Sequence, residues 1–190
     1  MSRKNTDNKA VTVFLSSSEE LSPFFYSEVE RLGQAIGEKS WDLVYGGTAQ
    51  GAMGALAAGF LHVPKTQRGQ LIGVVPDAYI KEWAHPQLDK VIACRELSDR
   101  KKLLCEEGDI MLAYPGGIGT LDEVMDFLAR LQLQMTDKSL VFYNYLRYWE
   151  PFLECLKLFE EQSTIPRGFY EKLQVLDNLE AVIECIDSLD

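Results

Sequence analysis

The chain has 190 residues, of which 46% are hydrophobic, so it can form one folded domain with a sizeable core and is not expected to be disordered. Its formal net charge of −10, with no cluster of Lys and Arg, argues against nucleic-acid polymers as partners, because binding them requires a basic face. No apolar run is long enough to span a membrane, and residues 1–10 are polar. We therefore expect a cytoplasmic protein without a membrane partner, with a polar tail at 1–10 and a single domain at 11–190.

The cysteines and histidines form no metal or redox motif. The four cysteines lie far apart in sequence, which favours buried free thiols over a Cys-x-x-Cys site. His62 and His85 are the only histidines, too few for a His-rich metal site. We expect no metal ion and no cofactor. The cysteines are Cys94, Cys105, Cys155 and Cys185.

Short apolar runs alternate with amphipathic stretches along the chain, as strands alternate with helices in α/β proteins. The strand runs are nearly continuous in apolar residues, which favours a parallel, doubly wound sheet flanked by helices. In chain order we expect strand 11–15, a helix from 22 to 36, strand 41–45, helix 55–60, strands 70–75 and 88–93, helix 98–106, strand 110–113, a helix from 119, strand 140–143, helix 149–160, strand 173–176 and helix 178–189.

The most informative stretch follows the strand at 110–113. Pro115–Gly117 breaks that strand, and Gly119 and Thr120 open the next helix. Glycines let the backbone approach a ligand closely, and unpaired N–H groups at a helix start favour an anion such as phosphate. The alternative is an ordinary turn with Thr120 as the N-cap. Glu123 in the first turn favours a site with chemistry, although first-turn acids also stabilise helices.

A second glycine-rich turn, Gly46–Gly54, follows the strand at 41–45. Alone it is a weak motif, because its glycines also suit close helix–sheet packing. Ligands of doubly wound sheets bind at the carboxyl ends of the strands. Both glycine turns and residues 16–18 can converge there.

The helix at 98–106, with Ser98 as its expected cap, carries Arg100 and Lys101 in its first turn. Cations at that position oppose the helix dipole. Either they form a solvated basic face, or an anionic ligand compensates them.

Together these motifs resemble the "lonely guy" family of cytokinin riboside 5′-monophosphate phosphoribohydrolases, whose members have often been mislabelled lysine decarboxylases. Pro115–Glu123 is similar to the family's Pro-Gly-Gly-x-Gly-Thr-x-x-Glu, Asp99–Lys101 to its Arg-Lys element, and Tyr45–Gly54 to its first glycine turn. The segments 72–76 and 132–138 extend the match, so that it covers roughly residues 11 to 145.

The resemblance implies a Rossmann-like fold, a homodimer or larger homo-oligomer, and hydrolysis of a purine nucleoside 5′-monophosphate, with or without an N6 modification, to free base and ribose 5-phosphate. By carry-over, Arg100 and Glu123 are the catalytic pair. The implied substrate-binding residues are Ser17, Gly46, Gly47, Gly51, Met53, Glu82, Lys101, Gly116, Gly117, Gly119 and Thr120.

The residues suit this chemistry. Cleavage of a glycosidic bond builds positive charge on the ribose, which a carboxylate such as Glu123 stabilises while it orients or deprotonates water. Arg100 would pair with phosphate or with developing negative charge, since its planar fork favours bidentate contacts.

The chain departs from the family pattern at Ser16, Thr48 and Ala129–Arg130. Arg130 lies about two helical turns beyond Glu123, on the same face. We favour an ion pair between Arg130 and Asp126 over a contact with the ligand. If Arg130 instead lined the base pocket, it would disfavour a prenyl group, and unmodified AMP would be the better substrate.

Three other functions fit the sequence less well. A nucleotide or molybdenum-cofactor carrier would use the same glycine turns, but it needs no carboxylate beside a sugar, so Glu123 with Arg100 favours the enzyme. An NAD-dependent oxidoreductase lacks its Gly-x-Gly-x-x-Gly and ribose-binding acid. Lysine decarboxylation lacks a marked Schiff-base lysine. Apolar residues in 127–135 and 143–152 either support an oligomer or belong to the core.

Overall fold

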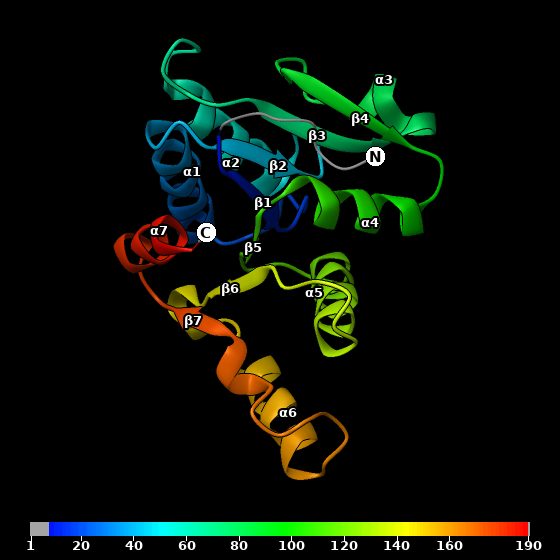
Figure 1. The fold of residues 1–190 in the computed structure, drawn as a ribbon. Coiled ribbons are helices and arrows are strands. Elements are labelled where there is room, and N and C mark those ends of the chain that lie inside the picture. The colour runs from blue at the N-terminus through cyan, green and yellow to red at the C-terminus, as the bar shows by residue number, and fades with distance from the viewer. Residues whose placement is uncertain (1–7, 190) are drawn as a thin grey trace.

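The computed structural model describes residues 8–189, and its ribbon shows one sheet with helices on both sides (Figure 1). Residues 1–7 of the expected polar tail lie outside the described residues. The strands are β1 (Ala10–Phe14), β2 (Asp42–Tyr45), β3 (Leu71–Pro76), β4 (Lys90–Cys94), β5 (Ile110–Ala113), β6 (Ser139–Tyr143) and β7 (Gln174–Leu176). The helices are α1 (Pro23–Glu38), α2 (Gly51–His62), α3 (Ile80–Trp83), α4 (Leu97–Glu107), α5 (Ile118–Gln132), α6 (Glu150–Glu161) and α7 (Leu179–Ser188).

The seven strands are all parallel, in the order β4-β3-β2-β1-β5-β6-β7. The predicted doubly wound parallel sheet is therefore confirmed. The chain winds outward from β1 to β4 and then returns to build β5, β6 and β7 on the other side of β1. The carboxyl ends of β1 and β5 consequently flank the switch point at which sheets of this kind bind ligands.

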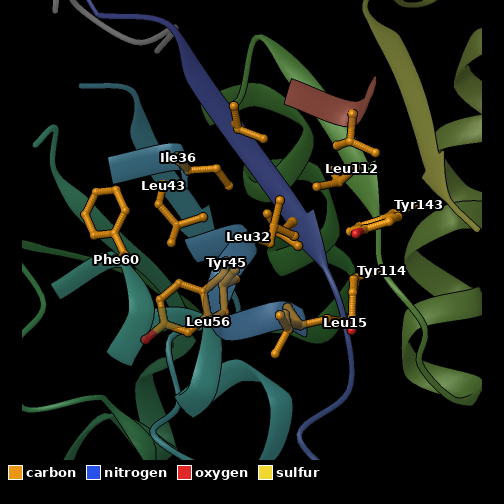
Figure 2. Packing of buried hydrophobic residues seen from close by; sticks show 14 of the residues in the cluster. Leu15, Leu32, Ile36, Leu43, Tyr45, Leu56, Phe60, Leu112, Tyr114 and Tyr143 are labelled. Carbon is orange, nitrogen blue, oxygen red and sulfur yellow. The ribbon is translucent and has the colours of Figure 1, made fainter. Parts of the chain in front are cut away.

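Side chains alternate between the two faces of the sheet, so each face has its own core. Val11 and Val13 of β1 pack with α1, α2 and α7, in the core shown in Figure 2. Ala10 and Phe14 of the same strand pack with α4, α5 and α6 on the other face. Among residues 8–189, no helix is both long and apolar enough to cross a membrane.

Several predicted boundaries were wrong. The helix α2 begins at Gly51, so the second half of the predicted glycine turn is helical. The cap of α4 is Glu96 rather than Ser98, because the Glu96 carbonyl already accepts the Arg100 N–H. The segment between β3 and β4, expected to be a loop, contains the short helix α3.

The four cysteines are free thiols, as predicted, but only two of them are buried. Cys94 and Cys105 lie inside the protein, whereas Cys155 and Cys185 are half-buried. The two half-buried thiols lie on α6 and α7, the outer helices of each layer, which have a solvent-facing side.

Helices α1 and α2 touch through their backbones at two glycines. A Cβ at Gly33 of α1 would overlap the carbonyl oxygen of Leu56, and a Cβ at Gly59 of α2 would overlap that of Glu30. Backbone atoms cannot move aside as a flexible side chain can. The close packing of this helix layer therefore requires both glycines.

Gly59→Ala should lower the free energy of unfolding by about 1–3 kcal/mol, because the new methyl group forces α1 and α2 apart. Urea unfolding followed by circular dichroism would measure the loss. The matched control is Ala58→Leu, which adds bulk to the exposed side of the same helix and should change stability little. Equal stability of Gly59→Ala and the wild type would contradict the close packing of α1 and α2.

Candidate active site

A cleft of about 410 Å³ lies at the carboxyl ends of the central strands, a volume typical of small-ligand sites. Its walls come from the turns after β1, β2, β3 and β5 and from the first turns of α4 and α5. Most of the predicted site residues meet here. The lining residues are Leu15, Ser16, Ser17, Ser18, Gly46, Thr48, Met53, Pro76, Trp83, Leu97, Arg100, Gly117, Ile118, Gly119, Thr120 and Glu123.

An ion pair between Arg100 and Glu123 forms part of the wall of this cleft. The Arg100 Nη1 donates to Glu123 Oε1 at 2.9 Å, and its Nε donates to the carbonyl oxygen of Val74 at 3.1 Å. Arg100 belongs to α4, Glu123 to α5 and Val74 to β3. The contacts fix the guanidinium at two of its nitrogens and hold the carboxylate from one side.

Burial dominates the electrostatics of Glu123. Only 6% of this residue is exposed, and desolvation raises its pKa to about 7, although the charge and the hydrogen bond of Arg100 act in the opposite direction. A carboxyl group with a pKa near neutrality can gain or lose a proton at physiological pH, which is the property of a general acid or base.

The start of α5 presents free hydrogen-bond donors to the cleft. Gly117 is the N-cap, so Thr120 lies within the first turn and the alternative of Thr120 as the cap is wrong. The first N–H groups of a helix have no intrahelical partner, and here they belong to Ile118, Gly119 and Thr120. The Thr120 hydroxyl is buried and, among the described residues, has no hydrogen-bond partner. Together these groups suit an anion such as phosphate.

Gly46 makes room for the ion pair. A Cβ at this position would overlap Arg100 Nη2 and press against the end of the Met53 side chain at 2.7 Å. Because Gly46 directly follows β2, the absence of its side chain lets the guanidinium lie against the end of that strand. Gly116 similarly lets the Thr120 side chain lie against the turn after β5.

Five of the predicted binding residues do not line the cleft. Gly47 and Gly51 have positive φ angles of 80° and 56° and shape the turn around α2, where few other residues are tolerated. Gly116 lies against the Thr120 side chain, where a Cβ would overlap the Thr120 hydroxyl. Lys101 is turned towards Asp122, and Glu82 is exposed on α3. Contact of these five residues with the substrate stays a prediction.

The two cations at the start of α4 find their partners on α5. Arg100 pairs with Glu123, and Lys101 pairs with Asp122 at 2.8 Å. The predicted choice was between a solvated face and an anionic ligand. Carboxylates of the neighbouring helix instead compensate the unfavourable position of both cations in the helix dipole.

Several residues of the cleft belong to no motif of the sequence. Trp83, Leu97 and Ile118 line it and are exposed apolar side chains. Leu97 and Ile118 are each the first residue of a helix and lie off its buried face. An apolar residue at such a position is the one feature of the sequence that could have indicated a contact with a ligand. Trp83 lay in a segment that we expected to be a loop.

Arg130 lies outside the cleft lining. Its Nε donates to Asp126 Oδ2 at 2.6 Å, so the predicted ion pair one turn apart on α5 is confirmed. The predicted preference for unmodified AMP depended on Arg130 lining the base pocket, and within this chain Arg130 does not line the cleft.

A larger hollow of about 630 Å³ lies beside α6 and is lined by Lys157, Glu160, Arg167 and their neighbours. Glu160 accepts the backbone N–H groups of Gly168 and Tyr170 there, and this contact closes the turn after α6. No residue of either glycine turn lines this hollow, so volume alone does not make it the better candidate.

The described residues that line the cleft include no lysine to hold pyridoxal phosphate as a Schiff base. Within residues 8–189 there is likewise no group of three His, Cys, Asp or Glu side chains placed to bind a metal ion.

Solved structures with similar folds include molybdenum cofactor proteins. A molybdenum cofactor binding protein from Rippkaea orientalis superimposes with a TM-score of 0.72 at 21% identity and covers 97% of this chain and 98% of its own. The molybdenum cofactor carrier protein of Chlamydomonas reinhardtii gives 0.68 at 20% identity, with 96% and 98% covered. At these identities the likeness concerns the fold alone.

Curated relatives are more similar in sequence. The cytokinin riboside 5′-monophosphate phosphoribohydrolase of Rhodococcoides fascians is 31% identical over 182 residues, which cover 95% of this chain and 90% of the relative. The protein of the same name from Mycobacterium tuberculosis is 29% identical, with 83% of each chain covered. A family model described as "Possible lysine decarboxylase" matches residues 53–186. The chain therefore belongs to this family, and its resemblance to the lonely guy phosphoribohydrolases is confirmed.

Proposed function

We propose that the protein hydrolyses the N-glycosidic bond of a purine nucleoside 5′-monophosphate and releases free base and ribose 5-phosphate. The observation that carries this proposal is the buried ion pair of Glu123 and Arg100, beside a helix start with free N–H donors. The relatives named cytokinin riboside 5′-monophosphate phosphoribohydrolase support the same reaction.

In the proposed reaction the phosphate binds at the start of α5, against the N–H groups of residues 118–120 and the Thr120 hydroxyl. The ribose then lies next to Glu123. The ionised carboxylate stabilises the positive charge that grows on the sugar and deprotonates the water that attacks C1′. The electrons of the broken C1′–N bond leave with the base, and Glu123 passes to the base the proton that it took from water, which regenerates the carboxylate.

Arg100 serves this carboxylate in two ways. Its charge favours the ionised form of Glu123, opposing the desolvation that raises the pKa. Its hydrogen bond to the Val74 carbonyl fixes the direction from which it holds Glu123. Within the cleft its guanidinium can also contact an anionic oxygen of the substrate.

A carrier function remains the alternative, since the solved molybdenum cofactor proteins share the fold. A carrier needs only the anion-binding turns. A buried carboxylate in the wall of a pocket for an anionic ligand costs desolvation and repels that ligand, so a carrier gains nothing from it. Hydrolysis, in contrast, gives the carboxylate a role beside the sugar. The position of Glu123 therefore favours the hydrolase.

The decisive experiment is base release from AMP, GMP, CMP and isopentenyl-AMP, followed by chromatography. Glu123→Gln should lower the rate roughly 10²- to 10⁴-fold, because it removes the general base and the charge beside the sugar. The matched control is Asp122→Asn, which alters the neighbouring, exposed acid of the same helix. That control should retain most of the activity.

Saturable nucleotide binding by the wild-type protein without base release would favour the carrier function. Equal loss in the two variants would show that Glu123 acts through general electrostatics rather than at the sugar.

The rate should depend on pH through Glu123. Below its pKa of about 7 the carboxyl group is protonated, so kcat/KM should fall about tenfold for each further pH unit. The free energy of unfolding should change in the opposite direction. The folded-state pKa of Glu123 is above the ordinary value of about 4.5 for a glutamate, so the folded protein keeps this proton to higher pH than the unfolded chain does. This contribution is lost as the pH rises from 4.5 to about 7. Thermal unfolding of Glu123→Gln across this range should lack this loss, whereas an unchanged profile would rule out Glu123 as the titrating group.

Gly46→Ala should lower kcat/KM about 10- to 100-fold with little loss of stability. The new methyl group displaces only the ends of two flexible side chains, Arg100 and Met53, but small misplacements of catalytic groups are costly. Steady-state kinetics and thermal unfolding of the same preparation separate the two effects. Wild-type kinetics would show that the position of Arg100 is unimportant, and an unfolded protein would show that Gly46 is a structural residue.

Three finer points belong to the proposal: that residues 11–190 act as one domain, that the protein is a cytoplasmic homodimer or larger homo-oligomer, and that cytokinin nucleotides are among its substrates. Leu133 and Met135, just after α5, are 69% and 67% exposed and support an oligomer. The preference for unmodified AMP stays a prediction, but Arg130 does not line the cleft and so no longer supports it.

A further inference from the structure

Trp83 presents an exposed aromatic face at the cleft. It stacks on Tyr79 with 3.8 Å between ring centroids and 5° between ring planes, and it is 43% exposed. The other two tryptophans are buried, with Trp41 6% and Trp149 3% exposed. Exposed indoles that line a pocket are suited to stack on flat ligands. Because Tyr79 covers one face of this indole, the opposite face is the one available to a ligand.

The segment that carries Trp83 is tied to the sheet. Ala84 forms an antiparallel bridge with Thr48, and the His85 N–H donates to the Gly47 carbonyl at 2.7 Å. These contacts join the residues directly after Trp83 to the glycine turn after β2. The backbone beside the indole is thus tied to the turn that holds Gly46 at the cleft.

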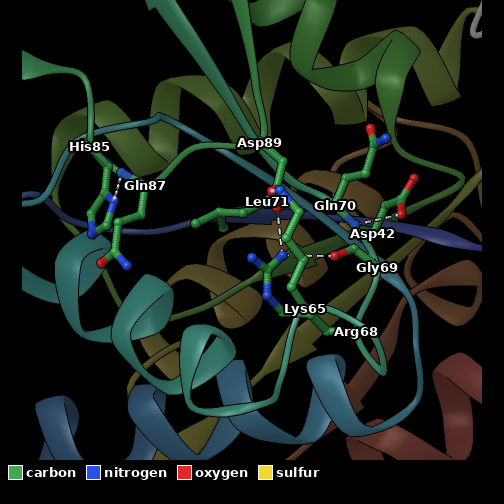
Figure 3. A network of polar contacts seen from close by, with 9 residues as sticks. All are labelled: Asp42, Lys65, Arg68, Gly69, Gln70, Leu71, His85, Gln87 and Asp89. Carbon is green, nitrogen blue, oxygen red and sulfur yellow. Dashed lines mark hydrogen bonds and ion pairs between the residues drawn. The ribbon is translucent and has the colours of Figure 1, made fainter.

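Three further hydrogen bonds fix the same segment before β4. The His85 Nδ1 accepts a hydrogen bond from the Gln87 N–H. The Asp89 carboxylate accepts hydrogen bonds from Arg68 Nη1 and from the Leu71 N–H, as Figure 3 shows. The neighbouring groups lower the Asp89 pKa to about 2, so this contact stays ionic at any physiological pH. The backbone after Trp83 is therefore fixed at both the bridge and the start of β4.

Trp83 lies across the cleft from the proposed phosphate site. The proposed phosphate site follows β5, whereas Trp83 follows β3, and β1 and β2 lie between these strands. Three strand spacings amount to about 14 Å. Arg100 spans this distance in part, since it contacts Val74 of β3 and Glu123 of α5. A ligand with phosphate at α5 and ribose at Glu123 would place its base towards β3.

The side chains at this end of the cleft are mainly apolar, with Thr48 of the β2 turn beside them. Pro76 and Leu97 line it together with Trp83, and neither offers a side-chain hydrogen-bond donor or acceptor. A base at this end would be held by its flat face more than by its edges. Stacking of this kind tolerates different bases, because every base has a π face.

We propose that Trp83, backed by Tyr79, is the platform on which the base of the nucleotide stacks and that it makes recognition of the base depend on stacking surface. This rests on the proposed function for the orientation of the ligand. Trp83 is a binding and positioning residue, and it takes no part in proton transfer.

Binding to the full chain in the Glu123→Gln background tests this, because that variant should leave the nucleotide intact. Trp83→Ala should weaken AMP binding roughly 5- to 150-fold, the range for loss of one stacked base, and should leave ribose 5-phosphate binding unchanged. Calorimetry measures both ligands. The loss should be larger for AMP and GMP than for CMP, whose base has a smaller face.

Trp83→Phe is the matched control, since it keeps an aromatic face. It should retain most of the affinity but lose the change in tryptophan fluorescence that AMP causes, because the remaining tryptophans are buried. In the active enzyme, Trp83→Ala should raise KM for AMP with a smaller effect on kcat.

Unchanged AMP affinity in Trp83→Ala would overturn the inference. So would an equal loss for ribose 5-phosphate, which would show that Trp83 shapes the phosphate site instead. Both results are independent of the hydrolase proposal, whose failure is an absence of base release by the wild-type protein. A carrier that stacks its nucleotide would thus disprove hydrolysis while confirming the role of Trp83.

Discussion

The cleft depends on one buried contact, the ion pair that joins α4 to α5 through Arg100 and Glu123. Removing a carboxylate from water is costly, and the raised pKa of Glu123 shows that the arginine does not offset the whole cost. Such a pair adds little to stability, so the rest of the fold must hold its two halves in place. The Val74 carbonyl and the side-chain-free position at Gly46 do so directly, because they leave the guanidinium one place to lie.

Stability comes instead from the layers away from the cleft. Strands β1, β2, β5 and β6 are buried on both faces, and α1 and α2 pack so closely that their glycines touch the opposite backbone. Two side chains from outside the cleft also hold the turn after β5 in place. The Tyr148 hydroxyl donates to the Gly116 carbonyl, and Trp149 Nε1 donates to that of Ala113. The stable layers thus hold an ion pair at the edge of the sheet that is costly to bury. This is a common form of the trade-off between stability and function.

Periodicity and turn residues were enough to predict the parallel sheet and to bring Arg100, Glu123 and the glycine turns to one edge, because the direction of parallel strands fixes which turns share that edge. Helix starts were less predictable. Gly51, Leu97 and Ile118 begin helices without a side-chain cap, so the propensity of Ser98 and Thr120 for the N-cap misled. The pairing of Lys101 with Asp122 and the stack of Trp83 on Tyr79 depend on distances between elements, which one sequence does not contain.

The two ends of the cleft differ in chemistry as the two ends of a nucleotide do. Free N–H groups and the Thr120 hydroxyl lie at one end, and Trp83 with its apolar neighbours lies at the other. An intact nucleotide can use both ends at once, and the second contact then costs little further loss of freedom. Hydrolysis breaks this link, after which base and ribose 5-phosphate are each held by one end only. A site divided in this way binds the substrate more tightly than either product, which favours release of the products.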